Sequence, residues 1–96
     1  MENVKKLFLE LNLDFDSLGV IYWLEVVDYS NEHHLTLPLK DILEQIAKKN
    51  DISRYALDSY LRRAIEPAQD KIQKKFKYKG KITTKTFLNL VRFVVR

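Results

Sequence analysis

Apolar residues recur at intervals of three and four along almost the whole chain, which is the spacing of one face of an α-helix. The 96 residues include only two glycines and two prolines, too few for the many turns of an all-β fold. A chain of this length forms a single hydrophobic core. The pattern therefore predicts one all-α domain over residues 1–96, a bundle of five or six helices, and no sheet of three or more strands.

The first two predicted helices differ in how much of their surface is apolar. The first, short helix has one apolar stripe, made of Val4, Leu7, Phe8 and Leu11. The second begins after Asp14 or Asp16, either of which suits an N-cap, and includes Tyr22 and Trp23, which we expect in the core. Its other apolar residues lie on almost every side: Phe15, Leu18, Ile21, Leu24, Val26 and Val27. A helix without a polar face is central to a bundle or covered by a partner.

A helix, a short turn and another helix are predicted between Pro38 and Ala68. Residues 28–38 are predicted to be a loop, and Pro38 suits the first turn of a helix that ends near Lys49. Asn50 and Asp51 interrupt this helix, and Ser53 suits the N-cap of the next one. The core side of that next helix holds Leu57, Leu61, Ala64, Ile65 and Ala68. This succession is typical of a helix-turn-helix.

The opposite side of the helix after Ser53 is polar and partly basic. Its residues, with those that flank it, are Tyr55, Ala56, Asp58, Ser59, Arg62, Arg63 and Glu66. Pro67 then interrupts the helical pattern. Because proline lacks a backbone donor and clashes with the preceding turn, a kink or break is predicted near Glu66.

Charge is divided unevenly along the chain. Residues 1–46 hold nine acids and three lysines, a balance of −6, whereas residues 47–96 hold four acids and fourteen lysines or arginines, a balance of +10. Residues 71–81 alone contain six lysines and no acid. Such asymmetry is typical of a surface that meets a polyanion, most often nucleic acid. A solvated basic surface is the alternative, and the acidic half offers a second face for another protein.

Aromatic residues interleave with these lysines, and a last helix follows them. Phe76 is expected to anchor the lysine run to the core, and Tyr78 either anchors it or stacks on a base. Thr83 or Thr84 caps a final helix, whose core positions are Phe87, Leu90, Val91 and Val94. Because β-branched residues lower helix propensity, a C-terminal strand is a lesser alternative.

Several kinds of chemistry are not expected. The chain has no cysteine, and neither glycine forms part of a Gly-rich phosphate loop. His33 and His34 are adjacent, an arrangement that rarely ligates one metal, and no residues pair as nucleophile and base. No apolar run suits a signal peptide or a membrane span, so a cytoplasmic protein is expected. We expect no enzyme activity, no cofactor and no metal.

Three stretches resemble the C-terminal effector domain of the stage-zero sporulation protein A family, the master regulators of endospore formation. They are "LGVIYWLEVVDY" at 18–29, "IAKKNDISRYALDSYLRRAIEPA" at 46–68 and "ITTKTFLNLV" at 82–91. The match from Ala47 to Ala68 needs no gap, although the linker that follows is shorter than the family's. The resemblance implies an all-helical domain of about six helices whose helix-turn-helix binds short DNA boxes, often as tandem dimers. No receiver domain is expected in this chain.

The chain departs from the family at the start of the recognition helix. There the family uses arginines and a glutamate, and these positions correspond to Ala56, Asp58 and Ser59. Arg62 matches a family arginine, while Arg63 stands where the family has histidine. An arginine bidentate to guanine contributes roughly 1–3 kcal/mol of discrimination. The chain is therefore predicted either to prefer another DNA sequence or to have lost its operator.

Two functions are open at this point. In the first, the chain is a small transcriptional regulator that contacts double-stranded DNA through Arg54, Tyr55, Asp58, Ser59, Arg62, Arg63, Lys71, Lys74, Lys75 and Lys77. In the second, it is an interaction protein from a phage or other mobile element that uses the same scaffold to inhibit or modulate a host protein. A weak homodimer, formed on DNA, is a further expectation.

Overall fold

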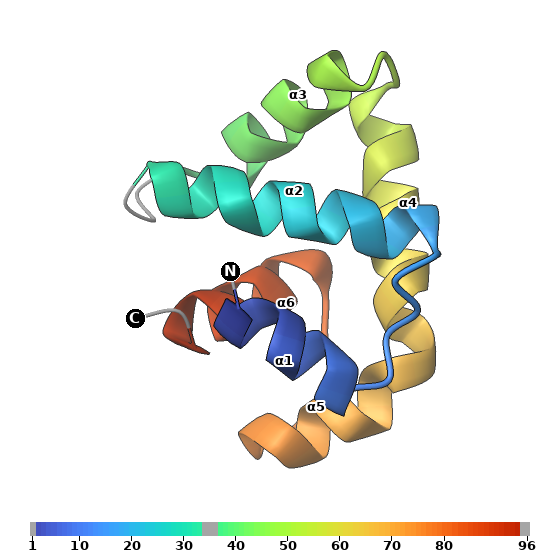
Figure 1. Ribbon diagram of the computed structural model, residues 1–96, viewed down its shortest axis with the longest axis vertical. Helices are drawn as coiled ribbons and strands as arrows, with labels where there is room; N and C mark the ends of the chain where they lie inside the picture. The colour runs from blue at the N-terminus through green and yellow to red at the C-terminus, as the bar shows by residue number, and fades with distance from the viewer. Residues whose placement is uncertain (1, 34–36, 95–96) are drawn as a thin grey trace.

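The computed structural model describes residues 2–33 and 37–94, and these ranges are helical with short connections (Figure 1). In chain order the elements are α1 (Glu2–Glu10), α2 (Leu18–Glu32), α3 (Leu39–Lys49), α4 (Arg54–Ile65), the 3-10 turn η1 (Glu66–Ala68), α5 (Gln69–Phe76) and α6 (Thr84–Val94). The two described ranges contain no strand. The prediction of an all-α bundle is confirmed. Within the same ranges, no helix has the length and apolar content needed to cross a membrane.

Helix α2 is the central element, and it packs against α3, α4 and α6 (Figure 1). Trp23 of α2 is fully buried, and its indole Nε1 donates a hydrogen bond of 2.8 Å to the backbone oxygen of Leu61 in α4. The indole also meets the ring of Phe87 in α6 edge-on, with ring centroids 4.9 Å apart. Tyr22 is buried as well. The expectation that Tyr22 and Trp23 belong to the core is confirmed.

Gly19 allows α2 and α4 to approach each other closely. A Cβ atom at this position would lie 2.5 Å from the backbone oxygen of Tyr60 and 2.9 Å from the Cβ of Ala64. Beside this contact, the rings of Tyr22 and Tyr60 pack edge-on with centroids 5.5 Å apart. Because the nearest atom belongs to backbone, any larger residue at position 19 would push the two helices apart.

Helices α1 and α6 complete the core on the other side of α2. The four apolar positions predicted for the first helix are all buried: Val4, Leu7, Phe8 and Leu11. The ring of Phe8 stacks on Phe87 with centroids 5.9 Å apart. In α6, Phe87 and Val91 are buried, and so is Leu88, which the predicted stripe did not include. The C-terminal strand considered as an alternative is wrong, because residues 84–94 are helical and the Thr83 Oγ1 accepts from the Thr86 amide at 3.1 Å.

The start of α2 differs from the prediction. Ser17, and neither Asp14 nor Asp16, holds the N-cap position, and its side chain makes no capping hydrogen bond. The Asp14 Oδ1 instead accepts from the Asp16 amide at 2.9 Å, inside the linker between α1 and α2. The carboxylate is used by its own turn and is therefore not available to the helix.

The end of α2 also differs, because the helix continues to Glu32 and so includes the first five of the eleven residues of the predicted loop 28–38. Ser30 is buried, and its Oγ accepts from the Arg92 Nε at 2.9 Å. Arg92 also donates to the backbone oxygen of Leu37 at 2.9 Å, and burial lowers the pKa of Arg92. Contacts with α6 therefore favour the last turn of α2 despite its polar sequence. Residues 34–36 of the predicted loop lie outside the described residues.

Four residues, Asn50–Ser53, join α3 to α4. Asn50 closes α3 by donating from Nδ2 to the Ile46 oxygen and to Glu25 Oε2, both at 2.8 Å. Asp51 takes a left-handed conformation with φ 54°, which aspartate tolerates better than most residues. The Ser53 Oγ accepts from the Ala56 amide at 3.0 Å, so the predicted N-cap of α4 is confirmed.

Pro67 interrupts the helix as predicted. Helix α4 ends at Ile65, the 3-10 turn η1 holds Pro67, and α5 leaves in another direction (Figure 1). The change of direction follows from the missing backbone N–H of proline. It places α5 and its lysines beside the end of α1.

Candidate nucleic-acid interface

Helix α4 has one side fixed in the core and the other open to solvent. Leu57, Leu61 and Ile65 are fully buried, as the apolar spacing predicted. On the opposite side, Tyr55 keeps 76% of its surface exposed, and Arg62 and Arg63 are exposed. A helix held in this way presents its outer side chains on a rigid backbone.

Arg54 lies at the border between α4 and α3. Its Nη1 is 3.3 Å from Glu44 Oε1, and its guanidinium carbon is 5.4 Å from the centre of the Tyr55 ring. Both partners are exposed enough for the pair to exchange with solvent. Arg54 is therefore a cation with an acid beside it, and not an isolated charge.

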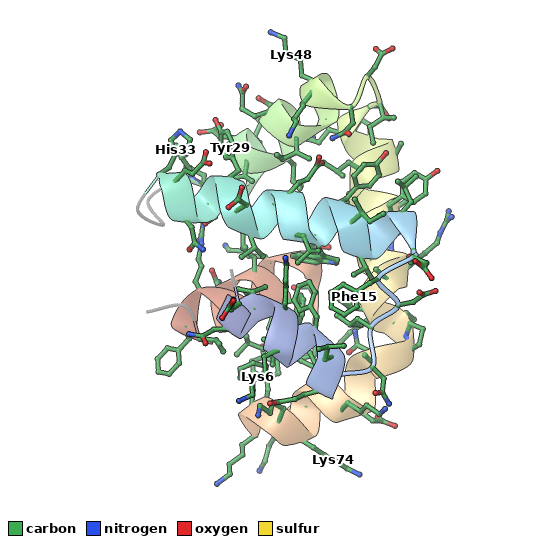
Figure 2. All side chains as sticks on the ribbon, in the orientation of Figure 1. Lys6, Phe15, Tyr29, His33, Lys48 and Lys74 are labelled. Atoms are coloured by element: carbon green, nitrogen blue, oxygen red, sulfur yellow. The ribbon has the colours of Figure 1, made fainter. Side chains whose placement is uncertain are left out.

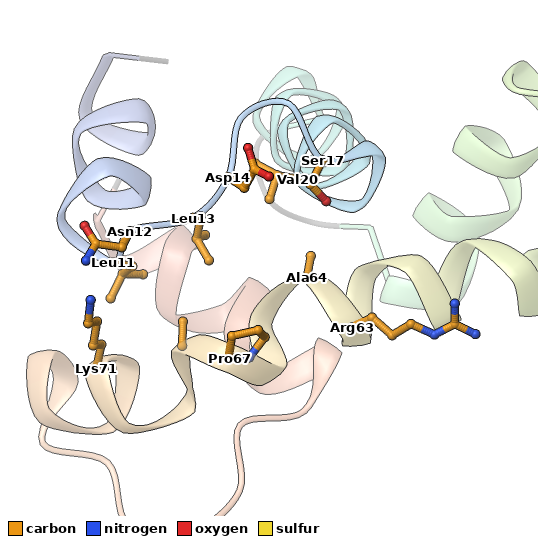
Figure 3. A pocket seen from close by; sticks show the side chains of 11 residues that line it. Leu11, Asn12, Leu13, Asp14, Ser17, Val20, Arg63, Ala64, Pro67 and Lys71 are labelled. Carbon is orange, nitrogen blue, oxygen red and sulfur yellow. The ribbon is translucent and has the colours of Figure 1, made fainter.

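The remaining predicted residues of α4 divide into a pair and two single side chains. Arg62 Nη1 is 3.6 Å from Asp58 Oδ2, one helical turn away. Ser59 is partly buried and makes no side-chain hydrogen bond to any described residue. Arg63 has no carboxylate within 4.0 Å in the described part of the chain, and its side chain extends away from α5 (Figure 3).

The lysines of α5 do not continue the outer side of α4. Lys75 Nζ is 2.6 Å from Glu10 Oε2 of α1, and this hydrogen bond, together with the charge of Lys75, lowers the pKa of Glu10. Lys71 extends toward Asn12 (Figure 3), and Lys74 extends from α5 into solvent (Figure 2). The ten predicted residues therefore form two groups, one on α4 and one on α5 with Lys77, separated by the bend at Pro67.

The segment between α5 and α6 carries contacts that the sequence did not predict. Gln69 forms two hydrogen bonds with the backbone of Ile82, and Gln73 forms one with the Gly80 oxygen. Phe76 is partly buried against the core, which agrees with its predicted anchoring role. Helical periodicity in the sequence does not reveal these contacts, because Gln69 and Ile82 are thirteen positions apart and Gln73 and Gly80 are seven apart.

A cavity of about 430 Å³ lies between the α1–α2 linker and the corner formed by α4, η1 and α5 (Figure 3). Apolar residues such as Leu13, Val20 and Pro67 line it together with Asp14 and Arg63. With Lys71 the lining holds one acid and two bases, a mixture that selects no single ligand class. In the described ranges, no three histidine, cysteine or acidic side chains are grouped to hold a metal ion.

His33 is used locally at the end of α2. Its Nδ1 lies 2.9 Å from the backbone oxygen of Tyr29, and its ring centroid is 4.3 Å from that of Tyr29 (Figure 2). His34, the other histidine of the predicted pair, lies outside the described residues.

No family model, curated protein or solved structure matched this chain. The features that indicate a function are therefore the geometry of α3, α4 and α5 and the charge of the second half of the chain. That charge is +10 over residues 47–96. The arrangement offers donors for an anionic partner and, among the described residues, no grouped set of metal ligands.

Proposed function

We propose that this chain is a small DNA-binding transcriptional regulator. The observation that carries the proposal is the outer side of α4, where Tyr55, Arg62 and Arg63 are exposed while the inner side is fixed in the core. A basic helix held after a short turn is the usual element for reading a major groove. The resemblance of residues 46–68 to the effector domain of sporulation regulators points the same way.

In this proposal the charged and the short polar residues of α4 have different roles. Arg54, Arg62 and Arg63 neutralise phosphates, and Lys71, Lys74, Lys75 and Lys77 add charge along the backbone. Tyr55, Asp58 and Ser59 lie nearest the base edges. Arg54, Arg62 and Lys75 must exchange Glu44, Asp58 and Glu10 for phosphate oxygens. Because exposed ion pairs contribute only about 0–1 kcal/mol, this exchange costs little.

A second candidate is an interaction protein that modulates a host protein. It is favoured by Ala56 and Ser59, which stand where the resembling family has base-reading arginines. It is also favoured by partly exposed apolar residues near the N-terminal end of α2, where Leu18 and Ile21 keep 44% and 42% of their surfaces exposed. The same apolar surface is also where the two copies of the expected homodimer would meet. The homodimer stays a prediction.

Fluorescence anisotropy with genomic duplexes at two salt concentrations tests the proposal. The wild type should bind with strong salt dependence. Replacing both exposed arginines (Arg62→Ala with Arg63→Ala) should lower the slope of log affinity against log salt by about two units and weaken binding on the order of tenfold to hundredfold. Asp58→Ala or Ser59→Ala should change sequence preference more than the slope, because these side chains neutralise no phosphate.

The matched control removes the same charge from another place. Lys5→Ala with Lys6→Ala takes two exposed cations from α1 and should change the slope much less. If the wild type binds no duplex even at low salt, and a host protein binds instead through the surface around Leu18 and Ile21, the second candidate replaces the first.

A further inference from the structure

The segment that connects α5 to α6, residues 77–83, alternates lysines with residues of other kinds, and we name it the lysine strap. Its lysines are all exposed: Lys77, Lys79 and Lys81. Ile82, in contrast, keeps only 1% of its surface exposed and belongs to the core. The strap is therefore fixed at one end by an apolar side chain while its ammonium groups stay in solvent.

Two glutamines of α5 hold the backbone of the strap. The Gln69 Nε2 donates to the Ile82 oxygen, and the Gln69 Oε1 accepts from the Ile82 amide, both at 2.8 Å. The Gln73 Nε2 donates to the Gly80 oxygen at 2.6 Å. The side-chain amide of Gln69 thus pairs with both backbone groups of one residue, as a neighbouring strand would. Gly80 permits this path because its φ of 104° is unfavourable for residues with a Cβ.

The first lysine of the strap occupies a position that favours glycine. Lys77 ends α5 with φ 52°, and the Tyr78 amide donates to the Gln73 oxygen at 2.9 Å. Helices commonly end with glycine in this left-handed conformation, which is unfavourable for residues with a Cβ. In the described ranges the other non-glycine residues with positive φ are Asn12 and Asp51, which tolerate it better. Lysine has no such local compensation.

The lysines of the strap are unpaired within the described ranges, although Asp70 of α5 lines the same pocket as Lys77 and Lys79. Residues 71–81 contain no acid, and the structure forms no ion pair between a described carboxylate and Lys77, Lys79 or Lys81. Lys75, by contrast, is already engaged by Glu10. The strap lysines, like Lys71 and Lys74 of α5, are therefore free to bind an anion.

From these observations we infer that the lysine strap is a second nucleic-acid surface, separate from α4, that binds the sugar-phosphate backbone. Gln69 and Gln73 are positioning residues that hold the strap in place for this contact. The inference rests on the proposed DNA-binding function and adds a second contact area to it. Fixing the backbone before binding reduces the entropy lost when lysines meet phosphates, and the unfavourable conformation of Lys77 is retained because the cation is used.

Lys77→Gly tests the inference because it should change two quantities in opposite directions: the stability of the protein should rise and its affinity for DNA should fall. Glycine suits φ 52° better than lysine, so the midpoint of thermal unfolding should rise. Removing one phosphate contact should weaken binding to a generic duplex roughly threefold to tenfold and lower the salt slope by about one unit. A variant that is more stable and binds as well as the wild type would show that Lys77 contacts no phosphate.

Gln69→Met tests the positioning role without changing charge. Methionine keeps the length of the side chain and removes both hydrogen bonds to Ile82. The salt slope should fall although every lysine is present, while the ranking of DNA sequences, set by α4, should stay the same. Gln45→Met is the matched control, because Gln45 is exposed on α3 and makes no side-chain hydrogen bond to a described residue. If Gln69→Met does not fold, Gln73→Met removes only the exposed hydrogen bond to Gly80.

The outcomes separate the strap from the proposed function. If the wild type binds duplex DNA and both Lys77→Gly and Gln69→Met match it in affinity and slope, the strap inference and the phosphate role of Lys77 are wrong, while DNA binding through α4 is unaffected. If the strap variants lose affinity while the Arg62→Ala and Arg63→Ala double variant does not, the inference about the strap is supported and the proposed role of α4 is wrong. If the wild type binds no duplex, both are wrong.

Discussion

At the scale of single residues, Gly19 decides how closely α2 and α4 pack. Helix propensity alone predicts that Gly19→Ala stabilises the protein by about 1 kcal/mol. The added Cβ would lie 2.5 Å from the backbone oxygen of Tyr60, however, and overpacking of this kind costs about 1–3 kcal/mol. Because the obstacle is backbone, we expect the overlap to exceed the propensity gain. Urea unfolding should therefore show a net loss of stability, and a gain would mean that the two helices can separate without cost.

At the scale of elements, the hydrogen bond at the start of α4 determines how well that helix is fixed. The Ser53 Oγ accepts from the Ala56 amide, and losing an N-cap costs about 1 kcal/mol. Ser53→Ala should lower the free energy of unfolding by that amount. Ser17→Ala is the matched control, since Ser17 holds the same position in α2 without a capping hydrogen bond. Equal effects of the two substitutions would mean that the Ser53 cap does not stabilise α4.

At the scale of the whole molecule, Glu10 and Lys75 join the acidic and the basic halves of the chain. Lys75 lowers the pKa of Glu10 from its ordinary value of 4.5 through a hydrogen bond and its charge. A carboxyl whose pKa is lower in the folded state stabilises the fold above the unfolded value and loses this contribution as pH falls through the folded value. Wild type and Glu10→Gln should thus differ in stability near neutral pH, and the difference should shrink as pH falls below 4.5 and vanish once pH is below the lowered pKa of Glu10.

The control for this experiment is Glu2→Gln, because Glu2 is an exposed acid of α1 that forms no ion pair within the described ranges. Chemical unfolding measured from neutral to acidic pH provides the comparison. If the difference between wild type and Glu10→Gln stays constant over that range, the pair between Glu10 and Lys75 does not contribute to stability in solution.

The local features of the fold could be predicted from sequence. Helical spacing identified the buried residues of α1 and α4, Ser53 identified the start of α4, and Pro67 identified its end. These features depend on residues within one or two helical turns of each other, so the sequence contains them directly. The basic character of residues 47–96 is likewise a property of composition.

The tertiary structure decided which of those charges are free. Lys75 is paired with Glu10 and Arg54 with Glu44, while Lys77, in the strap held by Gln69, pairs with no described carboxylate. It also decided that α2 continues to Glu32, because Ser30 meets Arg92. The partners lie far apart in the sequence: 10 positions for Arg54 and Glu44, 13 for Gln69 and Ile82, 62 for Ser30 and Arg92, and 65 for Lys75 and Glu10. Such contacts form only after the helices have packed, because packing is what brings distant side chains within hydrogen-bonding distance.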